Sequence, residues 1–213
     1  MKNYQYILLD WDGNLAKTLH VWIEVYRIIL NREGFYPGDE EIAHSFGGLT
    51  GYLVGLGFKD PDPFYEQADQ LAKKMLPNVE LYPDALEVLA YLKDKNKKTA
   101  LVTTSKRTYI EHLLDRYEMH RLFDVVITHD DVTEHKPNPE SLNKALVELG
   151  GNKDEAIMIG DSQSDLGAAV NAGVDSVLFY PPEHEKFYNL ELLKQHKPTY
   201  IVDDFRKVIK IVR

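Results

Sequence analysis

The chain has 213 residues, enough for one substantial core or for a core with a smaller appendage, and its 44% hydrophobic and 28% charged residues are ordinary for a soluble globular protein. The formal net charge of -9 argues against a general affinity for nucleic acid or for anionic membranes. The sequence has no cysteine, which excludes disulfides and thiolate metal sites, and no apolar run approaches the length of a membrane span. Because the N-terminus also lacks the apolar stretch of a signal peptide, we expect a cytoplasmic protein.

The N-terminal segment predicts a buried strand that ends in two aspartates. Residues 6–9 form a short apolar run, and Asp10-Trp11-Asp12-Gly13 follow it directly. Side chains alternate between the two faces of a strand, so Asp10 and Asp12 are expected to point the same way. Two carboxylates at the tip of a core strand repel each other, which a fold tolerates mainly where a cation, a proton or a reaction compensates. An ordinary turn, with Asp10 capping the next helix, is the alternative at this point.

The next segment, from about residue 20 to residue 82, is expected to be a helical insertion. Trp22 opens a stripe of apolar residues with helical spacing, and residues 64–76 predict a second helix. Between them, a cluster of glycines predicts a flexible or closely packed loop, at positions 47, 48, 51, 55 and 57. We therefore expect two domains: an α/β core formed by residues 1–18 and 80–213, and a helical cap formed by residues 19–79.

From about Thr99 onward, strand-like and helix-like segments alternate. Continuous apolar runs predict strands over residues 99–102, 125–127, 156–159, 176–179 and 200–202. Stripes with helical spacing lie between several of them, and a further helix is predicted over residues 85–92. This alternation predicts an α/β fold, in which a parallel sheet forms the middle of three layers and helices cover both of its faces.

Three further groups of polar residues follow predicted strands, where ligands of open parallel sheets bind. Thr103-Thr104-Ser105 could offer hydroxyl and N–H groups to a phosphate oxygen, or simply cap a helix. Lys136 lies in a loop stiffened by two prolines, although a lone lysine is usually a solvated surface residue. Asp161 and Asp165 belong to Gly-Asp-Ser-Gln-Ser-Asp, and their carboxylates are the ligands that Mg²⁺ prefers, while Asp165 could also serve the first turn of a helix. Together with Asp10 and Asp12, these residues would suffice for phosphoryl transfer.

The order of these motifs resembles the haloacid dehalogenase superfamily. The sequence contains Asp-x-Asp-Gly, a threonine after the second strand, Lys-Pro, and Gly-Asp-x-x-x-Asp, in that order across residues 6–165. The helical insertion is similar to the small cap of the phosphoglycolate phosphatase and β-phosphoglucomutase branch. The resemblance implies a Rossmann-like core with a helical cap, and a Mg²⁺-dependent phosphatase acting on a small phosphorylated metabolite. The oligomeric state, monomer or homodimer, stays open from the sequence.

The resemblance also implies a role for each motif residue. Asp10 would be the nucleophile that forms an aspartyl-phosphate, and Asp12 would protonate the leaving group and then activate water. Thr103 would bind the phosphoryl group. If the family's motif aligns one residue later, Thr104 would take this role. Lys136 would offset negative charge, and the Mg²⁺ ligands would be Asp10, the backbone carbonyl of Asp12, Asp161 and, in an outer shell, Asp165.

The sequence leaves two alternative functions open, and at Lys17 it departs from the family pattern. A phosphomutase could use the same intermediate, and a non-catalytic member could bind a phosphorylated ligand without turnover. Lys17 replaces an acid that is common in the family, and it could contact an anionic substrate or form a surface salt bridge. Specificity is expected to come from the cap loop 44–58 and its neighbours, such as His44 and Tyr52. Arg27, Arg32 and Lys59 are candidate contacts for an anion, although lysines and arginines of helices are usually exposed to solvent.

Overall fold

A computed structural model describes residues 2–213 of the chain, and its centre is a six-stranded parallel sheet. The strand order is β3-β2-β1-β4-β5-β6, so that β1 lies in the middle between β2 and β4. The strands are β1 (Tyr6–Leu9), β2 (Lys98–Val102), β3 (Val125–Ile127), β4 (Ala156–Gly160), β5 (Asp175–Phe179) and β6 (Tyr200–Val202). The prediction of an α/β fold with a parallel sheet is confirmed, and every predicted strand is present.

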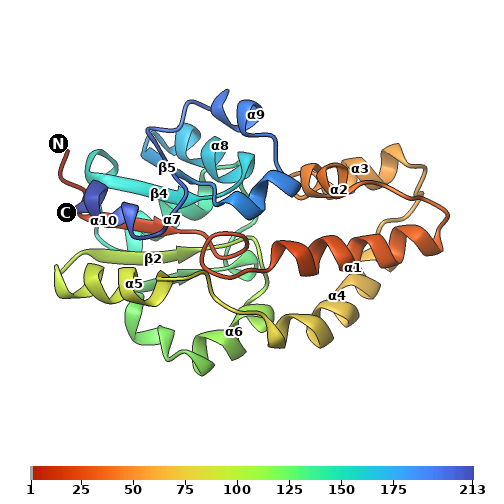
Figure 1. Cartoon of the computed structure of the whole chain (residues 1–213), viewed down its shortest axis with the longest axis horizontal. Coiled ribbons are helices and arrows are strands. Elements are labelled where there is room, and N and C mark those ends of the chain that lie inside the picture. The colour runs from red at the N-terminus through yellow and green to blue at the C-terminus, as the bar shows by residue number, and fades with distance from the viewer. Residues whose placement is uncertain (1) are drawn as a thin grey trace.

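Helices cover both faces of the sheet (Figure 1). Alternate residues of β1 enter different cores: Leu8 packs with buried residues of α7 and α8, whereas Ile7 and Leu9 belong to the core on the other face. The helices of this part of the chain are α5 (Ala85–Asp94), α6 (Arg107–Arg116), α7 (Glu140–Glu148), α8 (Gln163–Ala172), α9 (Leu190–Lys194) and α10 (Lys207–Val212). Short 3-10 segments span Leu76–Asn78, Met119–Leu122, His129–Asp131, Lys153–Glu155 and Pro182–Lys186.

Four further helices lie together beyond the carboxyl ends of the strands (Figure 1). They are α1 (Leu19–Arg32), α2 (Asp39–Ser45), α3 (Leu49–Gly55) and α4 (Asp62–Met75). Aromatic rings join them, and Tyr26 meets Phe64 edge to face at a centroid distance of 5.4 Å. The glycine-rich segment was expected to be a loop, and this is wrong for α3. The helix forms because Leu49 and Leu53, one turn apart, are buried against its neighbours, which offsets the low helix propensity of glycine.

The two chain segments that connect these helices to the sheet run side by side. Ala16 and Leu81 form an antiparallel bridge, and the Lys17 N–H donates to the carbonyl of Glu80 at 2.9 Å. The Tyr82 N–H donates back to the carbonyl of Leu15, also at 2.9 Å. The paired segments fix where α1 leaves the tip of β1 and where the chain returns to α5.

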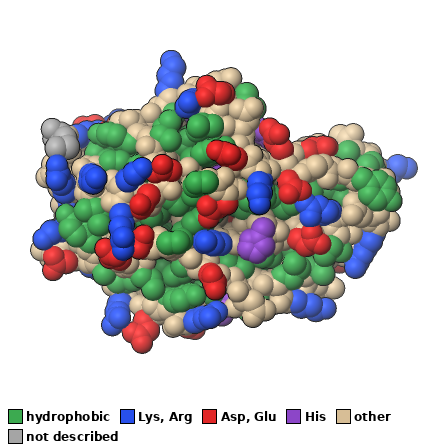
Figure 2. All heavy atoms as spheres, in the orientation of Figure 1, with side chains coloured by type: hydrophobic (Ala, Val, Ile, Leu, Met, Phe, Trp, Pro, Cys, Tyr) green, Lys and Arg blue, Asp and Glu red, His purple; other side chains and the backbone are tan. Residues whose placement is uncertain are grey.

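The surface carries both signs of charge. On the face shown in Figure 2, basic and acidic side chains are interspersed among hydrophobic ones, without a broad area of one sign among the described residues. Over residues 2–213, none of the helices combines the length and the apolar character needed to span a bilayer.

Candidate active site

The tip of β1 holds Asp10 in a fixed position at the centre of the sheet. The Asp10 N–H donates to the carbonyl of Ile159 on β4 at 2.9 Å, and the side-chain amide of Asn14 donates to the carbonyl of Asp10 at 3.0 Å. The turn that follows requires a glycine: Gly13 has a φ of 73°, and a Cβ atom there would lie 2.3 Å from Oδ2 of Asp161. This turn brings the loops after β1 and β4 into direct contact.

Lys136 forms the electrostatic centre of the site. Its Nζ atom lies 2.6 Å from Oδ1 of Asp10 and 2.5 Å from Oδ1 of Asp165, and it also donates to the carbonyl of Val102 at 3.1 Å. Its side chain is only 2% exposed, so Lys136 is not a solvated surface lysine. The loop that carries it is tied to α7, because the Glu140 carboxylate accepts hydrogen bonds from two backbone N–H groups of the loop.

Asp161 meets Asp10 from the loop after β4, and Asp165 meets it from the first turn of α8. Asp165 is the third residue of α8 and completes a capping box: its Oδ2 accepts hydrogen bonds from the Ser162 N–H at 3.1 Å and the Ser162 hydroxyl at 2.6 Å. Both oxygens of Asp165 are therefore occupied by protein donors. In contrast, Oδ2 of Asp161 is buried and has no hydrogen-bond partner among residues 2–213.

The cluster has too little positive charge for its carboxylates. Burial, and secondly repulsion from Asp165, raises the pKa of Asp10 to about 8, although Lys136 opposes this shift. The same two causes raise the pKa of Asp161 well above its usual value. Burial would lower the pKa of Lys136, but attraction to Asp10 and Asp165 outweighs it and leaves this pKa raised.

These residues fit a divalent cation such as Mg²⁺. One carboxylate oxygen from each of Asp10, Asp161 and Asp165 lies within 4.8 Å of the others. The unpartnered Oδ2 atom of Asp161 is available as a hard oxygen ligand. Oδ1 of Asp10 accepts a hydrogen bond from Lys136 and keeps a lone pair for a cation, whereas Oδ2 of Asp10 makes no hydrogen bond within residues 2–213 and stays free. A bound cation would balance the charge of the cluster.

Asp12 is held by donors from two parts of the chain. Its Oδ2 atom accepts a hydrogen bond from the Ser105 hydroxyl at 2.6 Å and lies 3.4 Å from the hydroxyl of Thr103. Its Oδ1 atom accepts a hydrogen bond from the indole N–H of Trp22 on α1 at 2.8 Å. Sequence reasoning did not assign Ser105 or Trp22 to Asp12. Ser105 follows the predicted strand and could have been found, whereas no motif marks Trp22.

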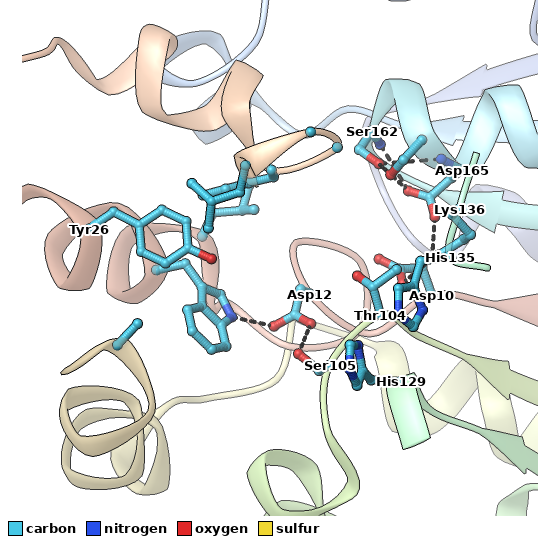
Figure 3. A pocket seen from close by; sticks show the side chains of 18 of the residues that line it. Asp10, Asp12, Tyr26, Thr104, Ser105, His129, His135, Lys136, Ser162 and Asp165 are labelled. Carbon is cyan, nitrogen blue, oxygen red and sulfur yellow. Dashed lines mark hydrogen bonds and ion pairs between the residues drawn. The ribbon is translucent and has the colours of Figure 1, made fainter. Parts of the chain in front are cut away.

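The two candidate threonines have different surroundings. Thr103 is 2% exposed, and its hydroxyl accepts a hydrogen bond from the Ser105 N–H at 3.0 Å. Thr104 instead lines the cavity above Asp10. In Figure 3 its side chain lies beside those of Asp10 and His135. Both threonines are thus close to the carboxylates. The preference for Thr103 over Thr104 as the residue that binds the phosphoryl group stays a prediction.

A cavity of about 400 Å³ lies between the sheet and the helices α1, α3 and α4. Asp10, Asp12, Lys136, Asp161 and Asp165 all line it. The predicted loop contributes through Gly47, Gly48, Leu49, Thr50 and Gly51, but the other candidate contacts from the cap do not line this cavity: His44, Tyr52, Arg27, Arg32 and Lys59.

Lys17, at the start of the same chain segment, does not line the cavity either. Its Nζ atom lies 3.7 Å from Oε1 of Glu183 and 5.4 Å from the centre of the Tyr82 ring. The structure therefore favours the surface salt bridge over contact with a substrate.

The comparison with known proteins identifies the class of this fold and site. The profile of the haloacid dehalogenase-like hydrolases matches residues 7–179, which include every motif described above. The chain belongs to the haloacid dehalogenase-like hydrolase family.

Alignments with individual relatives cover nearly the whole chain. It is 34% identical over 216 residues to the pyrophosphatase PpaX of Bacillus mycoides and 30% identical over 215 residues to that of Halalkalibacterium halodurans. Each alignment covers 97% of this chain and 95% of the relative. A crystal structure of a haloacid dehalogenase-like hydrolase from Bacteroides fragilis superposes with a TM-score of 0.86 at 27% identity, covering 97% of this chain and all of that one. The chain is thus a hydrolase of this family with relatives that are named as phosphatases.

Proposed function

We propose that the protein hydrolyses a small phosphomonoester with Mg²⁺ through an aspartyl-phosphate on Asp10. The observation that supports this most strongly is the arrangement of Asp10: one oxygen is fixed by Lys136, while the other is unpartnered and the residue lines a cavity of substrate size. Lys136 and the cation would offset charge on the transferring phosphoryl group, with a threonine after β2 as a hydrogen-bond donor.

The first half-reaction joins phosphorus to Asp10. The free Oδ2 atom of Asp10 attacks the phosphorus atom, and the bond between phosphorus and the ester oxygen breaks. The departing oxygen takes a proton from the carboxylic acid form of Asp12, so that the products are the alcohol, the aspartyl-phosphate and the Asp12 carboxylate. Ser105 and Trp22 hold Asp12 toward the cavity for this transfer.

The second half-reaction restores the enzyme. The Asp12 carboxylate takes a proton from a water molecule, whose oxygen attacks phosphorus. The bond between phosphorus and Oδ2 of Asp10 breaks, which releases inorganic phosphate and regenerates the Asp10 carboxylate. Asp12 returns to its acid form and can serve the next cycle.

Asp10 and Asp161 would hold Mg²⁺ directly, with the Asp12 carbonyl, while Asp165 supports the site from its capping box. These different roles follow from hydrogen bonding. Both carboxylate oxygens of Asp165 accept hydrogen bonds from protein donors, whereas Oδ2 of Asp161 accepts none within residues 2–213. When bound, the cation supplies electrostatic stabilisation of the phosphoryl group. The division into a core and a cap of residues 19–79 stays part of the same proposal.

Removal of divalent cations is expected to abolish turnover reversibly. The measurement is phosphate release from a panel that includes phosphoglycolate, sugar phosphates, nucleotides and pyrophosphate, with Mg²⁺ or with EDTA. We expect EDTA to stop release and excess Mg²⁺ to restore it, because the carboxylate cluster needs a compensating cation. Undiminished release in EDTA would contradict the metal requirement. Transfer of phosphate to a second sugar hydroxyl instead of water would favour a phosphomutase, and Mg²⁺ and ligand binding without any turnover would favour a regulatory member.

Trp22→Phe is expected to lower kcat about tenfold, with a smaller change in KM, because one hydrogen bond that positions Asp12 is lost. Trp22 is a positioning residue in this account, since it acts through Asp12. Thermal unfolding should be nearly unchanged, as the aromatic packing of position 22 is retained. An unaltered kcat, or a loss that appears only in KM, would show that the Trp22 hydrogen bond does not serve the chemical step.

A further inference from the structure

The wall that α1 to α4 contribute to the cavity is aromatic and almost free of charge. Tyr26 lies in this wall, and its hydroxyl points into the cavity (Figure 3) without a hydrogen-bond partner among residues 2–213. Burial raises the pKa of Tyr26, so this hydroxyl is a neutral donor. The other large side chains of the wall are apolar or aromatic: Leu19, Trp22, Phe46, Leu49 and Tyr65. Within the described part of α1 to α4, Asp69 is the only charged residue that lines the cavity.

The arginines of these helices are used elsewhere. Arg27 pairs with Glu24 at 2.6 Å and with Asp39, while Arg32 donates to Gln67 at 3.5 Å. Neither arginine lines the cavity. A negatively charged leaving group would therefore meet no lysine or arginine of these helices.

Asp69 is the charged residue of this wall, and it is paired with two lysines. Its carboxylate lies 2.7 Å from Nζ of Lys73 and accepts a hydrogen bond from the Tyr109 hydroxyl at 2.6 Å. These two contacts lower the pKa of Asp69, so the residue is an anion at neutral pH. Lys106, which lines the cavity from the loop after β2, lies 3.7 Å from Asp69, so its ammonium group is already paired.

The histidines that line the cavity are on the side of the sheet. His129 and His135 stack at a centroid distance of 4.1 Å and lie beside Thr104 and Ser105 (Figure 3). Burial, and then the neighbouring His135, lowers the pKa of His129, which leaves its ring neutral at neutral pH. Besides Lys106, Lys136 is the one lysine or arginine of the described residues that lines the cavity, and it lies where the transferred phosphoryl group would bind.

We infer that the group released from the phosphate is an uncharged alcohol with an aromatic or apolar body, and not a second anion. This inference rests on the proposed phosphatase function. A phosphate or carboxylate pressed against this wall would lose its hydration and would find the Tyr26 hydroxyl as a single neutral donor, since Lys106 is already paired with Asp69. A flat uncharged body can pack edge to face or offset on Trp22 and Tyr26, and the cavity has the volume for it. The chain would thus differ in substrate from its relatives named pyrophosphatases.

A matched pair of substrates tests the inference. 4-Carbamoylphenyl phosphate and 4-carboxyphenyl phosphate have nearly the same shape, but the second carries an additional negative charge on the leaving group. We expect kcat/KM to favour the carbamoyl compound by roughly tenfold or more, and to be lower still for pyrophosphate. Asp69→Asn should lower the ratio of kcat/KM between the carbamoyl and the carboxy compound. The control is Glu66→Gln, which makes an equal change of charge at an exposed position of α4 outside the cavity and should leave this ratio unchanged.

Binding provides a second measurement that needs no turnover. Tryptophan fluorescence of the Asp10→Asn variant with Mg²⁺ can follow each compound, since Trp22 lies in the wall. Tighter binding of the carbamoyl compound supports the inference. Equal binding and equal kcat/KM, or a preference for the carboxylate or for pyrophosphate, would overturn it while the phosphatase function stands. Failure of the function has a different signature: no phosphomonoester is hydrolysed, or Asp10→Asn hydrolyses as fast as the wild type.

Discussion

Asp10→Asn is expected to lower kcat by about 10⁴-fold or more, because an amide oxygen cannot act as the nucleophile that forms the phosphorylated intermediate. The fold should persist. In the absence of metal, the variant should unfold at a temperature equal to or above that of the wild type, since the substitution removes one of the carboxylates that repel Asp161 and Asp165. Lys136 retains its ion pair with Asp165.

The measurements are steady-state phosphate release with Mg²⁺ and thermal unfolding with EDTA. Asp115→Asn, an exposed carboxylate on α6 away from the cavity, is the matched control and should change neither quantity appreciably. An Asp10→Asn protein that is folded and nearly as active as the wild type would exclude Asp10 as the nucleophile.

Lys136→Met should cost both activity and stability. The side chain is 2% exposed and contacts Asp10 and Asp165, so its loss leaves buried carboxylates without a cation. Removing one partner from a buried ion pair typically lowers the free energy of unfolding by about 3–5 kcal/mol. We expect a loss of this order in EDTA and a smaller loss in saturating Mg²⁺, which would replace part of the missing positive charge.

A double substitution separates this cause from simple loss of packing. If uncompensated charge is responsible, Lys136→Met combined with Asp10→Asn should be more stable in EDTA than Lys136→Met alone. Denaturant unfolding of the wild type, both single variants and the double variant measures the coupling. The role given to Lys136 would be contradicted if the two substitutions changed the free energy of unfolding additively. It would also be contradicted if the Lys136→Met protein were as stable as the wild type.

The sequence predicted the sheet and the carboxylate cluster well because both depend on local patterns. Apolar runs marked each strand, and the polar residues that follow β1 and β4 had to meet at one edge of a parallel sheet. Asp165 was likewise predicted as a residue of a first helical turn, and α8 confirms this. Such features need only the period of a strand or helix and the rule that strands run parallel.

The features that the sequence did not reveal depend on contacts between distant segments. The hydrogen bond from Trp22 to Asp12 requires the precise angle at which α1 leaves the turn after β1. The pairing of Lys17 with Glu183 joins residues far apart in the chain. Helix α3 forms in a glycine-rich segment because its leucines are buried by neighbouring helices, which local propensity does not encode.

The most direct test of the central claim is to trap the phosphorylated protein. Enzyme in excess over a phosphorus-labelled substrate from the panel is mixed with Mg²⁺, quenched in acid at successive times, digested and analysed for labelled peptides. Our account predicts that one phosphoryl group appears on the peptide containing Asp10 and decays as inorganic phosphate forms, and that neither label nor phosphate appears with Asp10→Asn. Label on another residue, or phosphate released by Asp10→Asn at the wild-type rate, would contradict it.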